Sequence, residues 1–434
     1  MKKILIGGFA VLSMLTSVYS QTININYPPN AGKQYAFILD KGGKKDTITT
    51  GKLDSAGKTV LVVPAAQKGY AGILHFALID GVGLDFIVNK ENFSISCPEE
   101  QPNFENLKFT GSPENDFLNQ KMQQQKAILD KVGFVQYGLN LYKKEEPLYA
   151  AFQKENENLQ QQFTTLRNET ANSPLYAARF IEIYRFLMGI SSSFNQPEEE
   201  KAKELNLFVK EKLDMQVLYN SGFWNQAIEG WVNLQKMVIK DDAVLLTDTK
   251  QIMSRIKSNE IYTAFTEKIV AVFTKEGKDD LVNAISQYAA KSGKLEKPSK
   301  KLANTINAPV IGNSAPALQT AAGKKTINKK TLLFFYESGC NNCENEIHQL
   351  LGNYDIVKNK GYEIISVAAD MTKDATDGHD HTFPWKEQLC DFKGFAGPNF
   401  QTYAIIGTPT FFTIDEKGKI TGKYARLIDT EILK

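Results

Sequence analysis

This sequence contains few cysteines, and its positive and negative charges nearly cancel. Only four cysteines, Cys97, Cys340, Cys343 and Cys390, occur in 434 residues, too few for a fold that depends on disulfides. The 51 basic and 49 acidic residues give a net charge of +2, which gives no electrostatic reason to expect binding to nucleic acid or to a membrane surface. The composition therefore excludes a disulfide-stapled scaffold and does not support a nucleic-acid partner.

Long apolar runs are equally scarce, and the one that approaches the length of a membrane helix stands at the start. Lys2 and Lys3 precede an apolar stretch over 4–18, which small or neutral residues follow. This is the pattern of a cleavable secretory signal over residues 1–20, with cleavage near Ser20 and Gln21. The run is shorter than the roughly 20 apolar residues that cross a bilayer. We therefore expect an exported, periplasmic protein without a membrane anchor.

Residues 21–110 contain short strand-like segments separated by Gly, Asn, Asp and Lys clusters such as DKGGKKD. The alternation in QYAFILD and FSISC predicts sheets with one buried face. We expect an antiparallel β-sandwich or barrel. His75 and Cys97 lie within strand patterns, where a core or half-buried side chain is commoner than a functional one.

The pattern becomes helical over residues 111–293. Ser112 is the expected N-cap and Pro113 the first residue of the first helix. The segment PEEEKAKEL places acids in a first helical turn, where they complement the helix dipole. No fixed repeat period is present, so an irregular helical domain is expected. Two apolar faces are predicted to lie in its core: Tyr176, Phe180, Ile183 and Leu187 in one helix, and Ile261, Phe265, Ile269 and Val272 in another.

Residues 294–310 lose apolar periodicity and gain Lys, Asn and Pro, as a linker does. Residues 311–434 change class again. TLLFFY, YEIISVAAD, TPTFFTID and GKITGKYAR are predicted strands, and ENEIHQLLGNYDIVKNKG is a predicted helix. The order strand, helix, strand implies a parallel pair with a crossover, and the last two strands form a hairpin. The whole chain is therefore predicted to be a multidomain α+β protein that ends in an α/β domain.

Cys340 and Cys343 stand where the first strand of this domain ends and its helix begins. The free N–H groups and the partial positive charge of a helix N-terminus favour a thiolate at Cys340. Cys343 lies one turn further on, where it can resolve a mixed disulfide. A zinc site needs two more ligands at suitable spacing, and a c-type haem needs His where Glu344 stands. A working dithiol is the favoured interpretation, with a zinc half-site and an inert pair as alternatives.

A second motif is GTPT, residues 407–410, before the third strand. A proline that opens a strand cannot donate to the ladder, so it belongs at an edge. A cis bond between Thr408 and Pro409 would turn the backbone toward the cysteines. An ordinary turn proline is the alternative.

Together, these motifs resemble the thioredoxin superfamily and, within it, the extracytoplasmic TlpA/ResA-like thiol-disulfide oxidoreductases. IGNSAPALQ at 311–319 and FFTIDEKGKI add to the likeness. The resemblance implies that Cys340 is the nucleophile, Cys343 the resolving thiol and Pro409 the cis-proline. It also implies that Thr408 offers main-chain groups to a substrate strand and that Glu346 takes part in proton transfer. A surface helix glutamate is the alternative for Glu346.

The sequence departs from this family at three places. Gly339 replaces the usual aromatic before the first cysteine, Phe334 stands where thioredoxin keeps a buried acid, and His348 stands where the helix commonly has a proline. These departures prevent a prediction of the redox potential.

The polar segment 370–381 and Cys390 each allow a functional and a structural interpretation. Residues 370–381 gather Asp377, His379, Asp380 and His381, for which a solvated loop is favoured over a metal site. Cys390 is expected to be a buried helical thiol, and its pairing with Cys97 cannot be deduced from number alone. No cofactor is predicted.

The leading functional hypothesis is a protein-disulfide reductase that a membrane thiol donor recharges. Its expected partners are protein thiols and disulfides. An oxidase or isomerase differs only in redox potential. The rival hypothesis is a binding or assembly protein that uses a thioredoxin-like docking module with little redox turnover.

Overall fold

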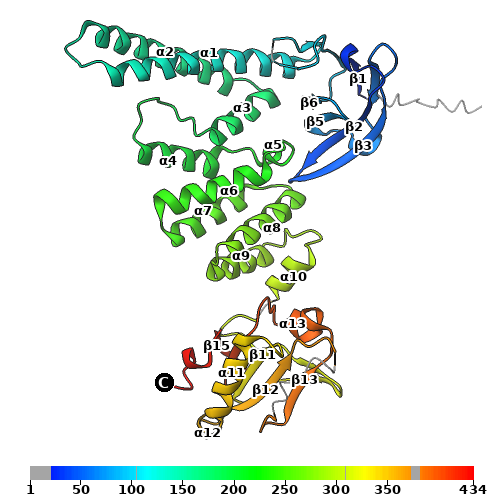
Figure 1. Ribbon diagram of the computed structural model, residues 1–434, viewed down its shortest axis with the longest axis vertical. Helices are drawn as coiled ribbons and strands as arrows, with labels where there is room; N and C mark the ends of the chain where they lie inside the picture. Colours follow the sequence, from blue (N-terminus) through cyan, green and yellow to red (C-terminus); the bar gives the residue numbers. More distant parts are fainter. Residues whose placement is uncertain (1–20, 104, 308, 373–381) are drawn as a thin grey trace, which may run out of the picture. The chain divides into compact units, whose positions relative to one another are not determined.

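The computed structural model describes residues 21–434 apart from 104, 308 and 373–381. The predicted signal segment 1–20 lies outside these residues, as does most of the polar loop with His379 and His381. The chain forms two compact units, of which the first ends at Ile256 and the second begins at Lys257. The division falls inside the stretch 111–293, which the sequence pattern assigns to one helical domain. Figure 1 shows the elements of both units.

The first unit opens with two four-stranded sheets, in the orders β4-β1-β7-β8 and β3-β2-β5-β6. Apolar residues of both sheets, among them Ile23, Phe37 and Phe86, form one buried core, so the two sheets form a sandwich. All strand pairs are antiparallel except β1 with β7, which is parallel. The strands are β1 (Thr22–Asn26), β2 (Gln34–Lys41), β3 (Lys44–Lys52), β4 (Lys58–Val62), β5 (Ala71–Leu78), β6 (Leu84–Asn89), β7 (Phe93–Ser96) and β8 (Lys108–Thr110).

Helices complete the first unit. Ser112 caps α1 by accepting a hydrogen bond from the Asn115 N–H, and Pro113 is the first helical residue, which confirms the predicted start. Three glutamates open α4, as predicted. The helices are α1 (Pro113–Leu141), α2 (Pro147–Ala171), α3 (Tyr176–Leu187), α4 (Glu198–Leu207), α5 (Met215–Tyr219), α6 (Trp224–Leu234) and α7 (Asp242–Arg255).

The two predicted apolar faces differ in how deeply they are buried. In α3, Tyr176 and Ile183 are buried, whereas Phe180 and Leu187 are half-buried. The second face lies in α8 of the second unit, and all four of its predicted residues are buried.

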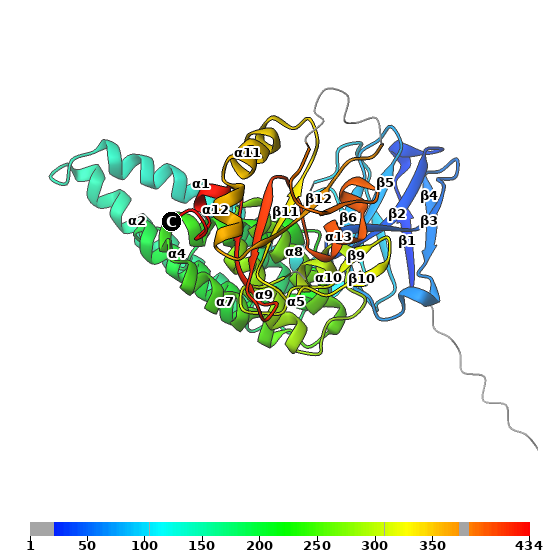
Figure 2. The ribbon, with the colours of Figure 1, turned by 90° about the horizontal axis from the view of Figure 1, so that it is seen from below.

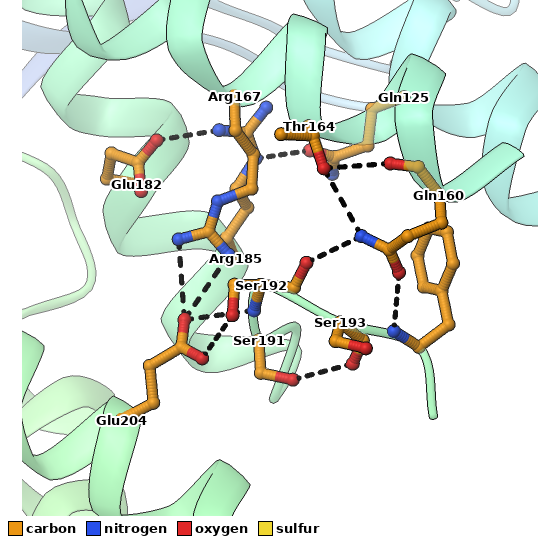
Figure 3. A network of polar contacts seen from close by, with 11 residues as sticks. Gln125, Gln160, Thr164, Arg167, Glu182, Arg185, Ser191, Ser192, Ser193 and Glu204 are labelled. Atoms are coloured by element: carbon orange, nitrogen blue, oxygen red, sulfur yellow. Dashed lines mark hydrogen bonds and ion pairs between the residues drawn. The ribbon is translucent and has the colours of Figure 1, made fainter. Parts of the chain in front are cut away.

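Polar contacts around the buried Arg185 and the half-buried Arg167 connect α1 to α4 (Figure 3). Arg185 of α3 is 1% exposed, and its guanidinium donates to Gln125 of α1 and pairs with Glu182, both at 2.6 Å. Arg167 of α2 pairs with Glu204 of α4 at 3.4 Å. A buried charge is costly unless it is paired in this way. The network therefore fixes the base of the α1–α2 hairpin against α3 and α4.

The second unit opens with helices α8 (Asn259–Lys275), α9 (Asp279–Lys291) and α10 (Lys300–Ile306). Helix α10 lies in the stretch 294–310 predicted as a linker. Ser299 caps it by accepting from the Leu302 N–H, and Gln287 of α9 donates to the Ile306 carbonyl at 3.0 Å. The stretch that was predicted as a linker from its Lys-rich and Asn-rich composition therefore contains a short helix packed on α9.

The rest of the second unit contains a five-stranded mixed sheet in the order β13-β12-β11-β14-β15. Strand β11 is parallel to β12 and antiparallel to β14, and β14 is antiparallel to β15. The predicted crossover pair and the final hairpin are thus confirmed. The strands are β11 (Thr331–Tyr336), β12 (Glu363–Ala368), β13 (Glu387–Cys390), β14 (Thr410–Ile414) and β15 (Ile420–Tyr424).

Several elements of this domain differ from the prediction. The predicted helix over 344–361 is two helices, α11 (Asn341–Gly352) and α12 (Tyr354–Asn359), with Asn353 between them. The sequence pattern did not predict β13, the small hairpin of β9 (Leu318–Thr320) and β10 (Gly323–Lys325), or α13 (Pro398–Thr402).

Both faces of the sheet are covered. Leu332 and Phe334 of β11 face Ile347 and Leu350 of α11, where Leu427 and Ile432 of the C-terminal segment also pack. Leu333 and Phe335 face the opposite side, toward Phe400 of α13 and Leu318 of β9. Figures 1 and 2 show α11 and α13 on opposite sides of the sheet. No helix among the described residues is long and apolar enough to cross a bilayer.

Candidate active site

The predicted dithiol lies at the end of β11. This strand ends at Tyr336, and α11 begins at Asn341 with Cys340 as its N-cap. Cys340 is half-buried, whereas Cys343 in the first turn is 0% exposed. Both are free thiols. The chain therefore presents one accessible and one covered sulfur at the positive end of a helix.

Gly339 allows the chain to turn into this helix. Its φ is +76°, in the left-handed region that glycine adopts without the steric cost of a Cβ. Its N–H donates to the Glu344 carboxylate at 3.2 Å, and the Glu344 N–H donates to the Cys340 carbonyl at 2.9 Å. The positive φ of this residue thus explains why glycine stands here in place of the usual aromatic residue.

The sulfur of Cys343 has several polar neighbours. The Glu337 N–H donates to it at 3.5 Å, and both the Thr408 side chain and the Cys340 thiol lie within hydrogen-bonding range. Burial is the largest influence and raises the pKa of Cys343 from 9.0 to about 11, although the bonds from Thr408 and Glu337 oppose it. Cys343 is therefore a neutral thiol at neutral pH.

The GTPT segment lies beside the dithiol. The Thr408–Pro409 peptide bond is cis, and Thr410 at the start of β14 pairs with Phe335 of β11. Thr408 and Pro409 are half-buried, and Ile406 before them is 81% exposed. The structure therefore brings Thr408, Cys340 and Cys343 together.

Glu346 lies in α11 but points to another part of the domain. Its carboxylate accepts the Leu427 N–H at 2.8 Å, and so fixes the C-terminal segment to α11. Within the described residues, its side chain makes no hydrogen bond to either sulfur. Its role in proton transfer remains a prediction.

Residues that were not singled out from the sequence complete the site. Asp370 follows β12 and accepts hydrogen bonds from the N–H and hydroxyl of Ser338, at 3.0 and 2.8 Å. Tyr336 is half-buried, and burial followed by the charge of Asp370 raises its pKa well above its ordinary value. The signal that could have indicated Asp370 was its position at the carboxyl end of a predicted parallel strand, because the carboxyl ends of such strands share one edge of the sheet.

The predicted environment of Cys390 is wrong. It ends strand β13, pairs with Ala368 of β12 and is exposed, whereas a buried helical thiol was expected. The pattern misleads because β13 is an edge strand with only one partner.

Cys97 is a buried free thiol after β7. His75 is half-buried in β5, between Asp40 and Asp85. Among the described residues, no group of three or more His, Cys, Asp or Glu is arranged to hold a metal ion.

The mixed sheet, the dithiol at a helix N-terminus and the cis-proline opposite it define a protein of the thioredoxin superfamily. The AhpC/TSA family model matches residues 311–423. The chain belongs to the ResA-like thiol-disulfide oxidoreductases, since it is 32% identical over 120 residues to a thiol-disulfide oxidoreductase ResA of Bacillus cereus and covers 68% of that protein. These findings establish a thioredoxin-like redox protein.

The chain is also similar to other proteins. The ResA protein of Bacillus thuringiensis subsp. konkukian is 33% identical over 117 residues, and the match spans 66% of that relative, just under two thirds, but only 25% of this chain. Among solved structures, a thioredoxin domain of a Bacteroides vulgatus thiol-disulfide oxidoreductase is 26% identical, with a TM-score of 0.24, and the match covers 27% of this chain and 91% of that one. A Bacteroides fragilis thiol-disulfide oxidoreductase is 28% identical, with a TM-score of 0.23 and coverages of 28% and 94%.

Proposed function

We propose that this protein is an extracytoplasmic thiol-disulfide oxidoreductase that reduces protein disulfides by exchange through Cys340 and Cys343. The observation that carries the proposal is the pair of free thiols in one helical turn, the first accessible and the second buried against it. The pattern of a secretory signal in residues 1–20 supports export.

The reaction begins at Cys340. Its thiolate attacks one sulfur of a substrate disulfide, which forms a mixed disulfide and releases the other substrate sulfur as a thiolate. Cys343 then loses its proton and attacks the Cys340 sulfur, which releases the second substrate thiolate and leaves a disulfide in the protein. Two electrons thus pass from the dithiol to the substrate, and the two released thiolates take up protons from water. A membrane thiol donor is proposed to return the protein to the dithiol form.

The surroundings of Cys343 suggest how the second step is controlled. Because burial raises its pKa to about 11, its proton must leave to a nearby base before it attacks. Glu346 is proposed to transfer this proton, although its carboxylate also holds the Leu427 N–H. The Thr408 hydroxyl stabilises the developing thiolate by hydrogen bonding. The main chain of Thr408 and Pro409 is proposed to pair with a substrate strand.

Replacement of Cys340 tests the proposal. We expect Cys340→Ser to reduce insulin reduction by dithiol to the uncatalysed rate, because the attacking sulfur is gone. Cys390→Ser is the matched control, since Cys390 is an exposed thiol of the same domain outside the turn, and it should retain activity. Full activity in Cys340→Ser would contradict the proposal.

The binding or assembly hypothesis remains the second candidate, because the family match spans only a quarter of the chain. Cys343→Ser separates the two functions. A cycling enzyme should accumulate mixed disulfides with cellular proteins through Cys340, whereas a docking module should trap none.

A further inference from the structure

The tip of the α1–α2 hairpin carries a contiguous group of exposed apolar side chains. Phe134, Tyr137 and Leu141 of α1 are 68%, 67% and 61% exposed, and Leu148 at the start of α2 is 50% exposed. Single exposed apolar residues are ordinary, but a contiguous patch marks an interaction site. We call these four residues the hairpin-tip surface.

An apolar groove lies beside these residues. It has a volume of about 500 Å³ and runs between α1 and α2, with Phe134, Val135, Leu148 and Phe152 in its wall and charged residues at its rim. Toward the base of the hairpin, a second hollow of about 500 Å³ is lined mainly by polar side chains such as Gln161. The apolar part is therefore confined to the tip.

The hairpin-tip surface lies beside the face of α1 that packs on α2, and its Phe134 ring also contacts the Phe152 ring of α2, with 5.9 Å between the ring centroids. The packed face consists of buried residues such as Ile128 and Val132, which share one core with Phe163 of α2. The exposed row on α1 has spacings of three and four residues, from Phe134 to Tyr137 to Leu141. This is the spacing of a coiled-coil seam, which accepts a second helix alongside it.

We propose that the hairpin-tip surface binds the same surface of a second copy of this chain, so that two hairpins form an antiparallel four-helix bundle. The partner helix must bring an apolar row with matching spacing, and α1 has one. The other strongly exposed apolar side chains on described helical segments, such as Met237 and Leu207, belong to no such row. A two-fold axis pairs identical patches and needs no further partner.

The charges at the rim suit this pairing. In an antiparallel arrangement, the Asp130–Lys131 end of one surface meets the Lys144–Glu145 end of the other. The first end carries one charge of each sign and the second carries two of each sign over 143–146, so opposite charges can face one another across the pair.

The area available also suits a dimer. Aromatic side chains bury about 150–250 Å² each, so the exposed parts of two aromatics and two leucines offer roughly 400 Å² of apolar surface. A standard interface buries roughly 800 Å² on each partner, and the polar side chains around the patch can supply the remainder. The network of Arg185 and Arg167 holds the base of the hairpin (Figure 3), so less conformational freedom is lost on binding.

The mass of the mature chain in solution tests the proposal. We expect light scattering to give the mass of a dimer at high protein concentration, and Phe134→Glu combined with Tyr137→Glu to weaken the association roughly 100-fold or more, since buried aromatics dominate interface energies. Met237→Glu is the control, because Met237 is 75% exposed but belongs to no apolar row, and it should leave the dimer intact. Circular dichroism should show that both variants fold, since the substituted side chains are exposed.

Two results would overturn the proposal. The wild-type chain could remain a monomer throughout, in which case binding of an added apolar helical peptide would assign the surface to a different protein. Alternatively, the dimer could persist in the double variant, which would place its interface elsewhere. Cross-links between Lys131 of one copy and Lys144 of another, detected in mixtures of isotopically labelled and unlabelled chains, would support the antiparallel pairing. Insulin reduction by the double variant should be unchanged, so this result is independent of the dithiol function.

Discussion

Polar and sulfur-containing side chains have different surroundings in the two units. In the first unit, Arg185 and Cys97 are at most 1% exposed, and Arg185 has polar partners on other helices. In the second unit, Cys340 stands half-buried at the end of β11, where a substrate can approach it. Removing one member of a buried pair destabilises a fold, whereas an accessible thiol at a helix N-terminus can react. The cysteine of the first unit is thus covered, whereas the second unit offers an accessible thiol in Cys340.

The substitution with the largest expected effect on this comparison is Arg185→Ala in the first unit. Removing one member of a buried pair leaves Glu182 and Gln125 without their partner, so we expect the free energy of unfolding to fall by about 3 kcal/mol. Urea unfolding followed by tryptophan fluorescence measures the loss, because Trp224 and Trp231 are buried in this unit. Insulin reduction should not change.

The matched control is Lys203→Ala, which removes an exposed ion pair with Glu199 in the same unit. It should have no measurable effect, because exposed pairs contribute little. If Arg185→Ala were equally silent, the network in Figure 3 would not stabilise the fold.

His75 provides a pH-dependent test with a smaller expected effect. Hydrogen bonds to Asp40 and then to Asp85 raise its pKa from 6.5 to about 9. Folding therefore favours the protonated ring, so its contribution is complete below the unfolded pKa of 6.5 and is lost as the pH rises through about 9. Because the ring is partly exposed, screening reduces this contribution to about 1–2 kcal/mol.

The measurement is the free energy of unfolding at about pH 6 and about pH 10, for the wild type and His75→Gln. The wild type should lose about 1–2 kcal/mol more than the variant between these values. Parallel profiles for the two proteins would show that the carboxylates do not hold the ring as an imidazolium.

Local sequence patterns predicted the elements that carry the dithiol. A continuous apolar run gave β11, and the helical spacing after Cys340 gave α11, because both signals lie within a few residues of the cysteines. The cap of α1 at Ser112 was equally local. The sandwich followed from alternation in its strands, although the parallel pairing of β1 with β7 did not.

Features that depend on distant contacts could not be predicted in this way. The bond between Glu346 and the Leu427 N–H joins residues 81 positions apart, and that between Ser338 and Asp370 spans 32. Strand β13 has a weak pattern of its own because it pairs with β12 only. Helix α10 depends on its packing against α9, since an isolated helix of this length is unstable. The exposed row of the hairpin tip was also missed, because periodicity indicates an apolar residue but not what covers it.

A substitution of Gly339, the residue before Cys340, has the smallest expected effect on stability. Its φ of +76° is strained for a residue with a Cβ, so Gly339→Ala should reduce the free energy of unfolding of the second unit by about 1 kcal/mol. Fluorescence of Trp385, which packs in this domain, measures the change when Trp224 and Trp231 are replaced by Phe in both proteins.

Gly352→Ala is the matched control for this change. Gly352 closes α11 without a positive φ, and an added Cβ would meet no atom within 4 Å. Alanine is the better helix former, so this variant should be as stable as the parent or more stable by up to about 1 kcal/mol. Equal effects of the two substitutions would show that the turn before Cys340 does not require glycine, and would leave the missing aromatic at this position without a backbone explanation.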